Sequence, residues 1–138
     1  IGSKKMSMLK LVTNIKGECT ETVVPEKTAA AVGSGDTEVY ATPAMIALVE
    51  KTAVKTLENR LEEGKTTVGT LLNVKHLAPT PVGMEVRCSC ELEQIDRRRL
   101  VFKVEVFDEC GLVGEGVHER FIVDRASFSQ RAKEKIKA

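Results

Sequence analysis

Three residues of this chain have side chains and positions suited to general acid–base chemistry and to binding a developing oxyanion: Thr42, Glu50 and His76. Glu50 lies on a predicted helical face of otherwise apolar residues, where a carboxylate loses hydration. Carboxylates of that kind are frequent at catalytic sites, where they act as general bases or nucleophiles. The alternative interpretation is that the helix is only partly covered and that Glu50 reaches solvent at the edge of the apolar stripe.

His76 ends a predicted strand and shares a face with Val68 and Leu72, so we expect it to point toward the core that the helix also faces. An imidazole beside a partly desolvated carboxylate can move protons near neutral pH, although a hydrogen-bonded structural histidine is the alternative. Thr42 precedes Pro43 at the expected start of the helix. Its hydroxyl is expected to cap the helix and, beside free N–H groups, is compatible with binding a developing oxyanion.

Two further residues are candidates for contacts with a substrate. Gly69 interrupts the strand that ends at His76, which indicates either a bend or a close approach of the backbone to a substrate carbonyl. Arg120 shares a face of the last predicted strand with His118, and nearby glycines leave room beside both side chains. We expect Arg120 to bind a carboxylate or polar acyl group, or to pair with an acidic neighbour.

The elements that must position these residues follow from the hydrophobic pattern. Residues 43–63 predict one long helix that ends at Gly64, and residues 25–37 predict a short helix followed by a loop. Loose alternation predicts one or two edge strands within residues 9–24. Alternation with a period of two predicts four more strands, near residues 68–76, 84–95, 100–107 and 112–123. A short amphipathic helix is expected over residues 125–137.

Consecutive strands with short connections are antiparallel, and one helix and one sheet must bury their apolar faces on each other. The predicted fold class is therefore α+β, a hotdog fold in which an antiparallel sheet wraps around one long central helix. We expect residues 1–8 to be a cloning remnant and a disordered N-terminus, and residues 9–138 to form a single domain.

Composition narrows the classes of partner. A formal net charge of +1 gives no reason to expect nucleic acid or an anionic membrane, and no apolar run approaches the ~20 residues that cross a bilayer. The four cysteines lack the spacing of a zinc site, so we expect no metal, and buried thiols indicate a cytoplasmic protein. Motifs of P-loop nucleotide binding, serine hydrolases and zinc proteases are not present in the sequence.

The chain also resembles the fluoroacetyl-CoA thioesterase-like family, a group of hotdog-fold acyl-CoA thioesterases. The matching segments follow one order along nearly the whole chain: V-Y-A-T-P at 39–43 ahead of Glu50, V-G-T at 68–70, V-K-H at 74–76, A-P-T-P-V-G at 78–83, R-R-L at 98–100 and G-V-H-E-R at 116–120. Each segment alone is weak, whereas the ordered set is fairly specific.

The resemblance implies hydrolysis of a small acyl-CoA thioester, with no cofactor other than the coenzyme A of the substrate. It implies that Glu50 attacks the thioester carbonyl or activates water, that His76 manages protons, and that Thr42 polarises or positions the carbonyl. Gly69 and Arg120 are the implied contacts around the acyl group. By analogy of fold, we expect a homodimer with its active site between the subunits.

The sequence departs from the family at the segment before the helix. The fluoroacetyl-specific enzyme has aromatic residues there, whereas residues 33–37 are G-S-G-D-T here, and Lys51 occupies a position where that enzyme has a large aromatic residue. We therefore expect a short-chain acyl-CoA thioesterase that is not specific for fluoroacetyl-CoA. The alternatives are a non-catalytic acyl-CoA-binding or sensing module on the same fold and, with less support, a hotdog hydratase.

Overall fold

The computed structural model describes residues 9–137, and the expected remnant and disordered segment at residues 1–8 lies outside the described residues. In chain order the elements are β1 (Lys16–Thr22), the 3-10 turn η1 (Pro25–Lys27), α2 (Ala29–Val32), α3 (Thr42–Thr56), β2 (Lys65–His76), β3 (Glu85–Asp96), β4 (Arg99–Asp108), β5 (Gly111–Asp124), α4 (Arg125–Glu134) and the 3-10 turn η2 (Lys135–Lys137). This order confirms the predicted sequence of one strand, a short helix, the long helix and four further strands.

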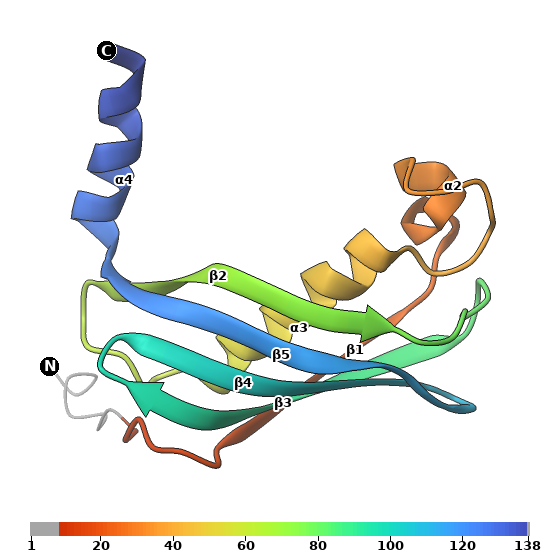
Figure 1. Ribbon diagram of the computed structural model, residues 1–138, viewed down its shortest axis with the longest axis horizontal. Helices are drawn as coiled ribbons and strands as arrows, with labels where there is room; N and C mark the ends of the chain where they lie inside the picture. The colour runs from red at the N-terminus through yellow and green to blue at the C-terminus, as the bar shows by residue number, and fades with distance from the viewer. Residues whose placement is uncertain (1–8, 138) are drawn as a thin grey trace, which may run out of the picture.

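The strands form one sheet in the order β1-β3-β4-β5-β2, and every neighbouring pair is antiparallel. The long helix α3 lies against one face of this curved sheet (Figure 1). The arrangement confirms the expected α+β hotdog architecture. β1 and β2 are the two edge strands, so β2 keeps one backbone edge that no strand within residues 9–137 pairs.

The core lies between α3 and the central strands. Alternate residues of β3 and β4 point toward the helix and are fully buried: Val86, Cys88, Cys90, Leu92, Leu100, Phe102, Val104 and Val106. The helix contributes Met45, Leu48, Val49, Thr52, Ala53 and Thr56 to the same interior. Burying each large apolar side chain contributes roughly 1.5–3 kcal/mol, so this packing fixes which face of α3 is inside.

That buried face overlaps the predicted one only in part. The sequence pattern predicts a stripe through Ile46, Glu50, Ala53, Val54, Leu57 and Leu61; Ala53 and Leu57 are buried as predicted, whereas Val54 is 50% exposed and the side chain of Glu50 is 42% exposed. The prediction was wrong for Glu50 and Val54 because the sheet also covers the adjacent row of the helix, one residue away in the 100° step of the α-helix. Glu50 lies at the margin of the core, which is the alternative that the sequence left open.

Both ends of α3 also differ from the prediction. Ala41 is the N-cap, whereas Thr42 lies in the first turn, and no side chain caps this end of the helix. The helix ends at Thr56 and not near Gly64. Asn59 follows with a left-handed φ of 62°, a conformation that stops a helix and that asparagine tolerates.

β2 contains a bulge that resets its alternation. The register shifts by one residue between Gly69 and Leu71, which leaves Thr70 as the extra residue. Gly69 faces α3 before the bulge, and His76 faces α3 after it. A strict period of two places these two residues on opposite faces, and that prediction was wrong because a bulge adds one residue to the count.

The last helix, α4, extends away from the sheet beyond the end of β5 (Figure 1). Its described residues bury no side chain, so it is a projecting helix and not a second layer of the core. No helix within residues 9–137 combines the length and the apolar character that crossing a membrane requires.

Candidate functional site

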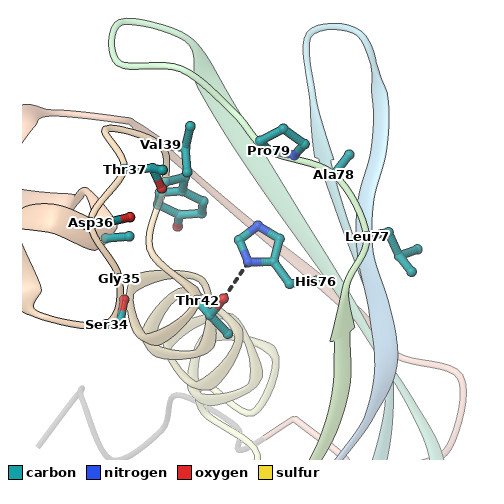
Figure 2. Close-up of a pocket in the computed structure, with 12 residues that line it drawn as sticks. Ser34, Gly35, Asp36, Thr37, Val39, Thr42, His76, Leu77, Ala78 and Pro79 are labelled. Atoms are coloured by element: carbon teal, nitrogen blue, oxygen red, sulfur yellow. Dashed lines mark hydrogen bonds between the residues drawn. The ribbon is translucent and has the colours of Figure 1, made fainter.

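Thr42 and His76 form one half of the candidate site. Thr42 lies in the first turn of α3, and His76 is the last residue of β2. Oγ1 of Thr42 lies 2.7 Å from Nδ1 of His76, and the two side chains face each other across the gap between the helix and the strand (Figure 2). Because Thr42 makes no helix cap, its hydroxyl is available for this hydrogen bond.

A cavity of about 360 Å³ opens beside this pair. Its wall includes Tyr40, the segment 77–79 and the loop that precedes α3, where Ser34, Asp36 and Thr37 carry short polar side chains. The loop residues are exposed, so the cavity is open to water on that side. This half of the site therefore combines a hydroxyl and an imidazole with room for a small group.

The surroundings of His76 favour its neutral form. Burial lowers the pKa of His76 below the ordinary value of 6.5. The ring of Tyr40 meets the imidazole edge to face, with 6.4 Å between ring centroids, and the Tyr40 hydroxyl donates to Glu21. Nε2 of His76 has no hydrogen-bond partner among the described residues. One ring nitrogen is thus fixed by Thr42, and the other is buried without a partner among these residues.

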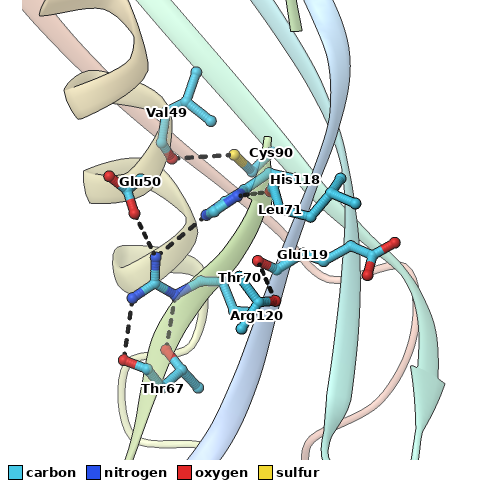
Figure 3. Close-up of polar contacts among 9 residues, drawn as sticks. All are labelled: Val49, Glu50, Thr67, Thr70, Leu71, Cys90, His118, Glu119 and Arg120. Carbon is cyan, nitrogen blue, oxygen red and sulfur yellow. Dashed lines mark hydrogen bonds and ion pairs between the residues drawn. The ribbon is translucent and has the colours of Figure 1, made fainter. Parts of the chain in front are cut away.

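Glu50 belongs to a second group of residues. Its Oε2 lies 3.4 Å from Nη1 of Arg120, a side chain that β5 holds in the interior (Figure 3). The guanidinium is fixed from the other side by Thr67, because Nε donates to its hydroxyl at 2.9 Å and Nη2 donates to its carbonyl oxygen at 3.1 Å. Arg120 thus pairs with an acidic neighbour, which is one of the two predicted roles.

Because Gly69 has no side chain, Glu50, His118 and Arg120 can approach its backbone closely. A methyl group on Gly69 overlaps Oε2 of Glu50 and comes within 3.4 Å of the ring of His118 and of Nη1 of Arg120. The structure shows the register shift after Gly69 and the close approach of the Glu50 carboxylate to its backbone, while the expected contact with a substrate carbonyl stays a prediction. Any other residue at this position has to displace the Glu50 carboxylate or a neighbour.

The two groups do not meet within one chain. Among residues 9–137, no hydrogen bond or ion pair joins Glu50 to Thr42 or to His76. Thr42 and Glu50 lie eight residues apart on α3, which is about 12 Å along the helix axis at 1.5 Å per residue. The predicted site residues therefore fall into a Thr42–His76 group and a Glu50–Gly69–Arg120 group.

Sequence reasoning missed two members of the second group, Thr67 and His118. The sequence pattern placed His118 on the same face as Arg120, which the structure confirms, but it assigned His118 no role. Thr67 received no attention, because the predicted strand began at residue 68 and an alternation counted from His76 turns the residues before the bulge away from the helix. Neither residue lies opposite a polar partner, since Thr67 pairs with Ile122 and His118 with Leu72, so no pairing signal in the sequence finds them.

The cysteines and acidic residues add no metal centre. Within the described part of the chain, no three His, Cys, Asp or Glu side chains are arranged to hold a metal ion. Cys88 and Cys90 are buried free thiols, as expected, and Cys19 is partly buried. Cys110 is exposed, which contradicts the expectation of buried thiols, because it lies in the turn between β4 and β5.

Comparisons with known proteins connect these residues to characterised enzymes. The family model for fluoroacetyl-CoA-specific thioesterases matches residues 23–126 of this chain. The fluoroacetyl-CoA thioesterase of Streptantibioticus cattleyicolor is 35% identical over 101 residues, which make up 73% of this chain and 73% of that protein. Residues 23–126, which the family model matches, include every predicted site residue.

Solved structures agree with the sequence matches. A structure of a fluoroacetyl-CoA thioesterase has a TM-score of 0.86 at 28% identity and covers 92% of this chain and 98% of its own. A thioesterase superfamily member from Thermus thermophilus has a TM-score of 0.82 at 28% identity and covers 96% of this chain and 98% of its own. The sheet and the central helix are thus shared across these proteins.

Proposed function

Because this chain belongs to the fluoroacetyl-CoA-specific thioesterase family and is an acyl-CoA thioesterase, we propose that it cleaves small acyl groups from coenzyme A with Thr42, Glu50 and His76. The reaction adds water across the thioester C–S bond and yields a carboxylic acid and the thiol of coenzyme A. The observation that carries the assignment of residues is the 2.7 Å contact between Thr42 and His76 beside an open cavity.

The contact supports a division of labour between the two side chains. With its proton on Nδ1, His76 donates to Oγ1 of Thr42, and the Thr42 hydroxyl then donates to the carbonyl oxygen of the thioester. That hydrogen bond stabilises the negative charge that develops on the oxygen in the transition state. Nε2 of His76 then has a free lone pair, takes a proton from the attacking water and returns it to the departing sulfur.

Glu50 can act by either of two routes, and both convert the thioester and water into the same acid and thiol. In the first route a Glu50 oxygen attacks the carbonyl carbon, the C–S bond breaks, and water then hydrolyses the mixed anhydride. In the second route Glu50 orients the water that attacks the carbonyl carbon directly. Trapping the acylated Glu50 with hydroxylamine separates the routes, because only the first route forms an anhydride on that side chain; oxygen-18 from solvent in the Glu50 carboxylate would also establish the first route, with water attacking the glutamyl carbon.

The proposal includes a homodimer in which two chains complete each site. Within one chain Glu50 lies about two helical turns from Thr42, so a single chain does not supply all three groups at one point. A two-fold axis near Ile46 reverses the helix and brings Thr42 of one protomer opposite Glu50 of its partner. Thr42 and His76 of one protomer then act with Glu50, Gly69 and Arg120 of the other.

The exposed edge of β2 supports this assembly. β2 ends the sheet, and its edge offers unpaired backbone groups to a second strand. Leu71 and Leu72 in the middle of β2 are exposed large apolar side chains, which is the composition expected of a surface that a partner covers. Antiparallel pairing of two β2 strands about a two-fold axis covers both features at once.

The loop beside the cavity supports a substrate range that is not restricted to fluoroacetyl-CoA. Residues 34–37 line the cavity with small polar side chains and leave it open to solvent. Such a wall does not form a dry apolar gate around one fluorinated acyl group. We therefore propose short-chain acyl-CoA thioesters, including unfluorinated ones, as substrates.

Neither a resident cofactor nor a special compartment is needed for this chemistry. The division of labour above uses side chains and water, so we propose that coenzyme A enters only as part of the substrate. The buried thiols of Cys88 and Cys90 are free, and free thiols persist in reducing compartments, which supports a cytoplasmic location. Because no resident cofactor is proposed, we expect activity to be unchanged after dialysis against a chelator.

An acyl-CoA panel tests the proposed function. Purified protein is mixed with acetyl-, fluoroacetyl-, propionyl- and butyryl-CoA, and released thiol is followed with a colorimetric trap. We expect turnover of several short acyl-CoAs, and we expect Glu50→Ala and His76→Ala each to lower kcat by at least about 100-fold. Tight binding without turnover across the panel would instead support a non-catalytic acyl-CoA-binding module.

A further inference from the structure

His118 is a fully buried polar side chain at the centre of the second group of site residues. Its exposed fraction is 0%, and its ring stacks on Phe102 with 6.2 Å between ring centroids and an interplanar angle of 27°. A buried imidazole is costly unless both ring nitrogens have partners. Both nitrogens of His118 have one: Nδ1 lies 2.9 Å from the carbonyl oxygen of Leu71, and Nε2 lies 3.2 Å from Nη1 of Arg120.

These two partners fix the protonation of the ring. A carbonyl oxygen only accepts hydrogen bonds, so Nδ1 of His118 carries a proton and donates to Leu71. A guanidinium nitrogen only donates, so Nε2 of His118 is unprotonated and accepts from Arg120. His118 is therefore neutral and held in one tautomer.

The Nδ1 bond acts on the bulge of β2. Leu71 is the first residue after the register shift, so its carbonyl group marks where the strand resumes its pairing with β5. By holding this carbonyl, His118 stabilises the bulge that turns Gly69 toward α3. Figure 3 shows the ring of His118, a residue of β5, reaching Leu71 of β2. The position of Gly69 beside Glu50 thus depends on a side chain from a different strand.

The Nε2 bond acts on the guanidinium. Nη1 of Arg120 carries two N–H groups, and its two acceptors are Nε2 of His118 at 3.2 Å and Oε2 of Glu50 at 3.4 Å. Thr67 accepts from Nε and Nη2. Four of the five N–H groups of Arg120 therefore have acceptors, and His118 is the one that sets the direction of the N–H aimed at Glu50.

We propose that His118 is a positioning residue of the thioesterase, which aims Arg120 at Glu50 and holds the β2 bulge that brings Gly69 to the same carboxylate. The proposal rests on the proposed function for the role of Glu50. It gives His118 no contact with substrate and no proton transfer. Its effect on catalysis passes through Arg120 and through the backbone of β2.

Two substitutions separate positioning from packing. His118→Phe keeps an aromatic ring against Phe102 but removes both hydrogen bonds, whereas His118→Asn keeps one donor and one acceptor but removes the ring. We expect His118→Phe to lower kcat by at least about tenfold with little change in KM, and His118→Asn to recover most of that loss. A merely structural role predicts the reverse order, with the ring-preserving variant the more active one.

A double-mutant cycle tests whether His118 acts through Arg120. If it does, His118→Phe costs much less in an Arg120→Gln background than in the wild-type protein, because the guanidinium to be aimed is already gone. We expect the additional loss in kcat to be no more than about threefold there. Equal losses in both backgrounds would overturn the claim that His118 aims Arg120 at Glu50.

The tautomer of His118 gives a readout that does not depend on turnover. The chain has two histidines, so a long-range ¹H–¹⁵N spectrum of protein labelled at histidine shows two rings, and His76→Asn assigns them. We expect His118 to be neutral with its proton on Nδ1 at pH 7. A ring protonated on Nε2 alone would overturn the inference even if the protein hydrolyses acyl-CoA. The expected tautomer in a protein without turnover would refute the proposed function and leave the geometry of His118 intact.

Discussion

Thr42 and His76 approach to 2.7 Å between the first turn of α3 and the last residue of β2. The hydroxyl of Thr42 is used for this contact and not for capping its own helix, since no side chain caps α3. The Thr42 hydroxyl therefore serves the contact with His76, and the stability of α3 does not depend on it as a cap. Substitutions at Thr42 are expected to change activity without a matching change in stability.

Replacing Thr42 by valine tests that separation. Thr42→Val keeps the shape of the side chain and removes the hydroxyl, so we expect kcat/KM to fall by about 100-fold, which is typical of losing one donor to the developing oxyanion. The free energy of unfolding is expected to change by less than about 0.5 kcal/mol, because no cap is lost. Steady-state kinetics and thermal unfolding measure the two effects. Thr42→Ser is the matched control and should keep most activity; a large loss of stability in Thr42→Val would contradict the assignment.

Gly69→Ala tests the close approach of Glu50 to β2. The added methyl group overlaps the Glu50 carboxylate, and the least costly relaxation swings that flexible carboxylate away from Arg120. We expect a loss in stability of no more than about 1 kcal/mol and a loss in kcat of at least about tenfold. Gly35→Ala is the control for stability, since its methyl group meets Ala29 at an ordinary 3.4 Å. Full activity in Gly69→Ala would show that the position of Glu50 is unimportant.

The pH dependence of kcat/KM follows from the environment of His76. Burial lowers its pKa below 6.5, so the ring stays neutral and able to accept a proton to lower pH than an exposed histidine. We expect the acidic limb of the profile to have its midpoint below pH 6.5 and to disappear in His76→Asn, whose residual rate is followed over the same range. An acidic limb centred above pH 6.5 would contradict the assignment of His76 as the proton carrier.

Stability is expected to depend on pH through the same residues. Burial also lowers the pKa of His118, and both folded-state values lie below the unfolded value near 6.5. The unfolded chain therefore binds more protons than the folded one as the pH falls below about 6.5, so the free energy of unfolding decreases toward the folded-state pKa values. Denaturant unfolding at pH 7.5 and pH 5.5 measures this decrease, and His118→Asn should reduce it. If the free energy of unfolding decreases equally between pH 7.5 and pH 5.5 in the wild-type protein and in His118→Asn, this would argue against a buried neutral His118.

Thr67→Val removes one of the two groups that hold Arg120 against β2. The Nε of Arg120 then lacks its hydroxyl acceptor in a buried position, which costs about 1–3 kcal/mol of stability. We expect kcat to fall as well, because the guanidinium next to Glu50 is no longer fixed on that side. Thr67→Ser keeps the hydroxyl and is the matched control. Identical unfolding curves for the two variants would mean that the bond does not hold Arg120.

The sequence was sufficient for the architecture because its signals there are local and strong. Thr-Pro at the start of α3 and the regular alternation along β3, β4 and β5 indicate one helix and a set of hairpin-linked strands. The short connections made the sheet antiparallel, and the helix then had one face on which to pack. These features depend on neighbouring residues alone, so no long-range information was needed.

The geometry of the site was less accessible to sequence reasoning. The bulge at Thr70 moves Gly69 to the face of the helix, and a bulge leaves little mark on a hydrophobic pattern. Packing over the whole face of the sheet decides which of two adjacent rows of α3 is buried. The sequence of the helix alone therefore could not place Glu50 at the margin of the core. The link from Arg120 to Thr67 depends on the register of β5 against β2, which is a property of the folded sheet.

The central claim is that Glu50 and His76 act in one site that two chains complete, and mixed dimers test it most directly. The Glu50→Ala and His76→Ala chains are each expected to be inactive alone. They are mixed in equal amounts, unfolded and refolded together. Half of the dimers are then mixed, and each mixed dimer holds one site with both residues intact, so we predict about a quarter of the wild-type activity. A mixture that forms mixed dimers but is no more active than either parent would contradict the claim.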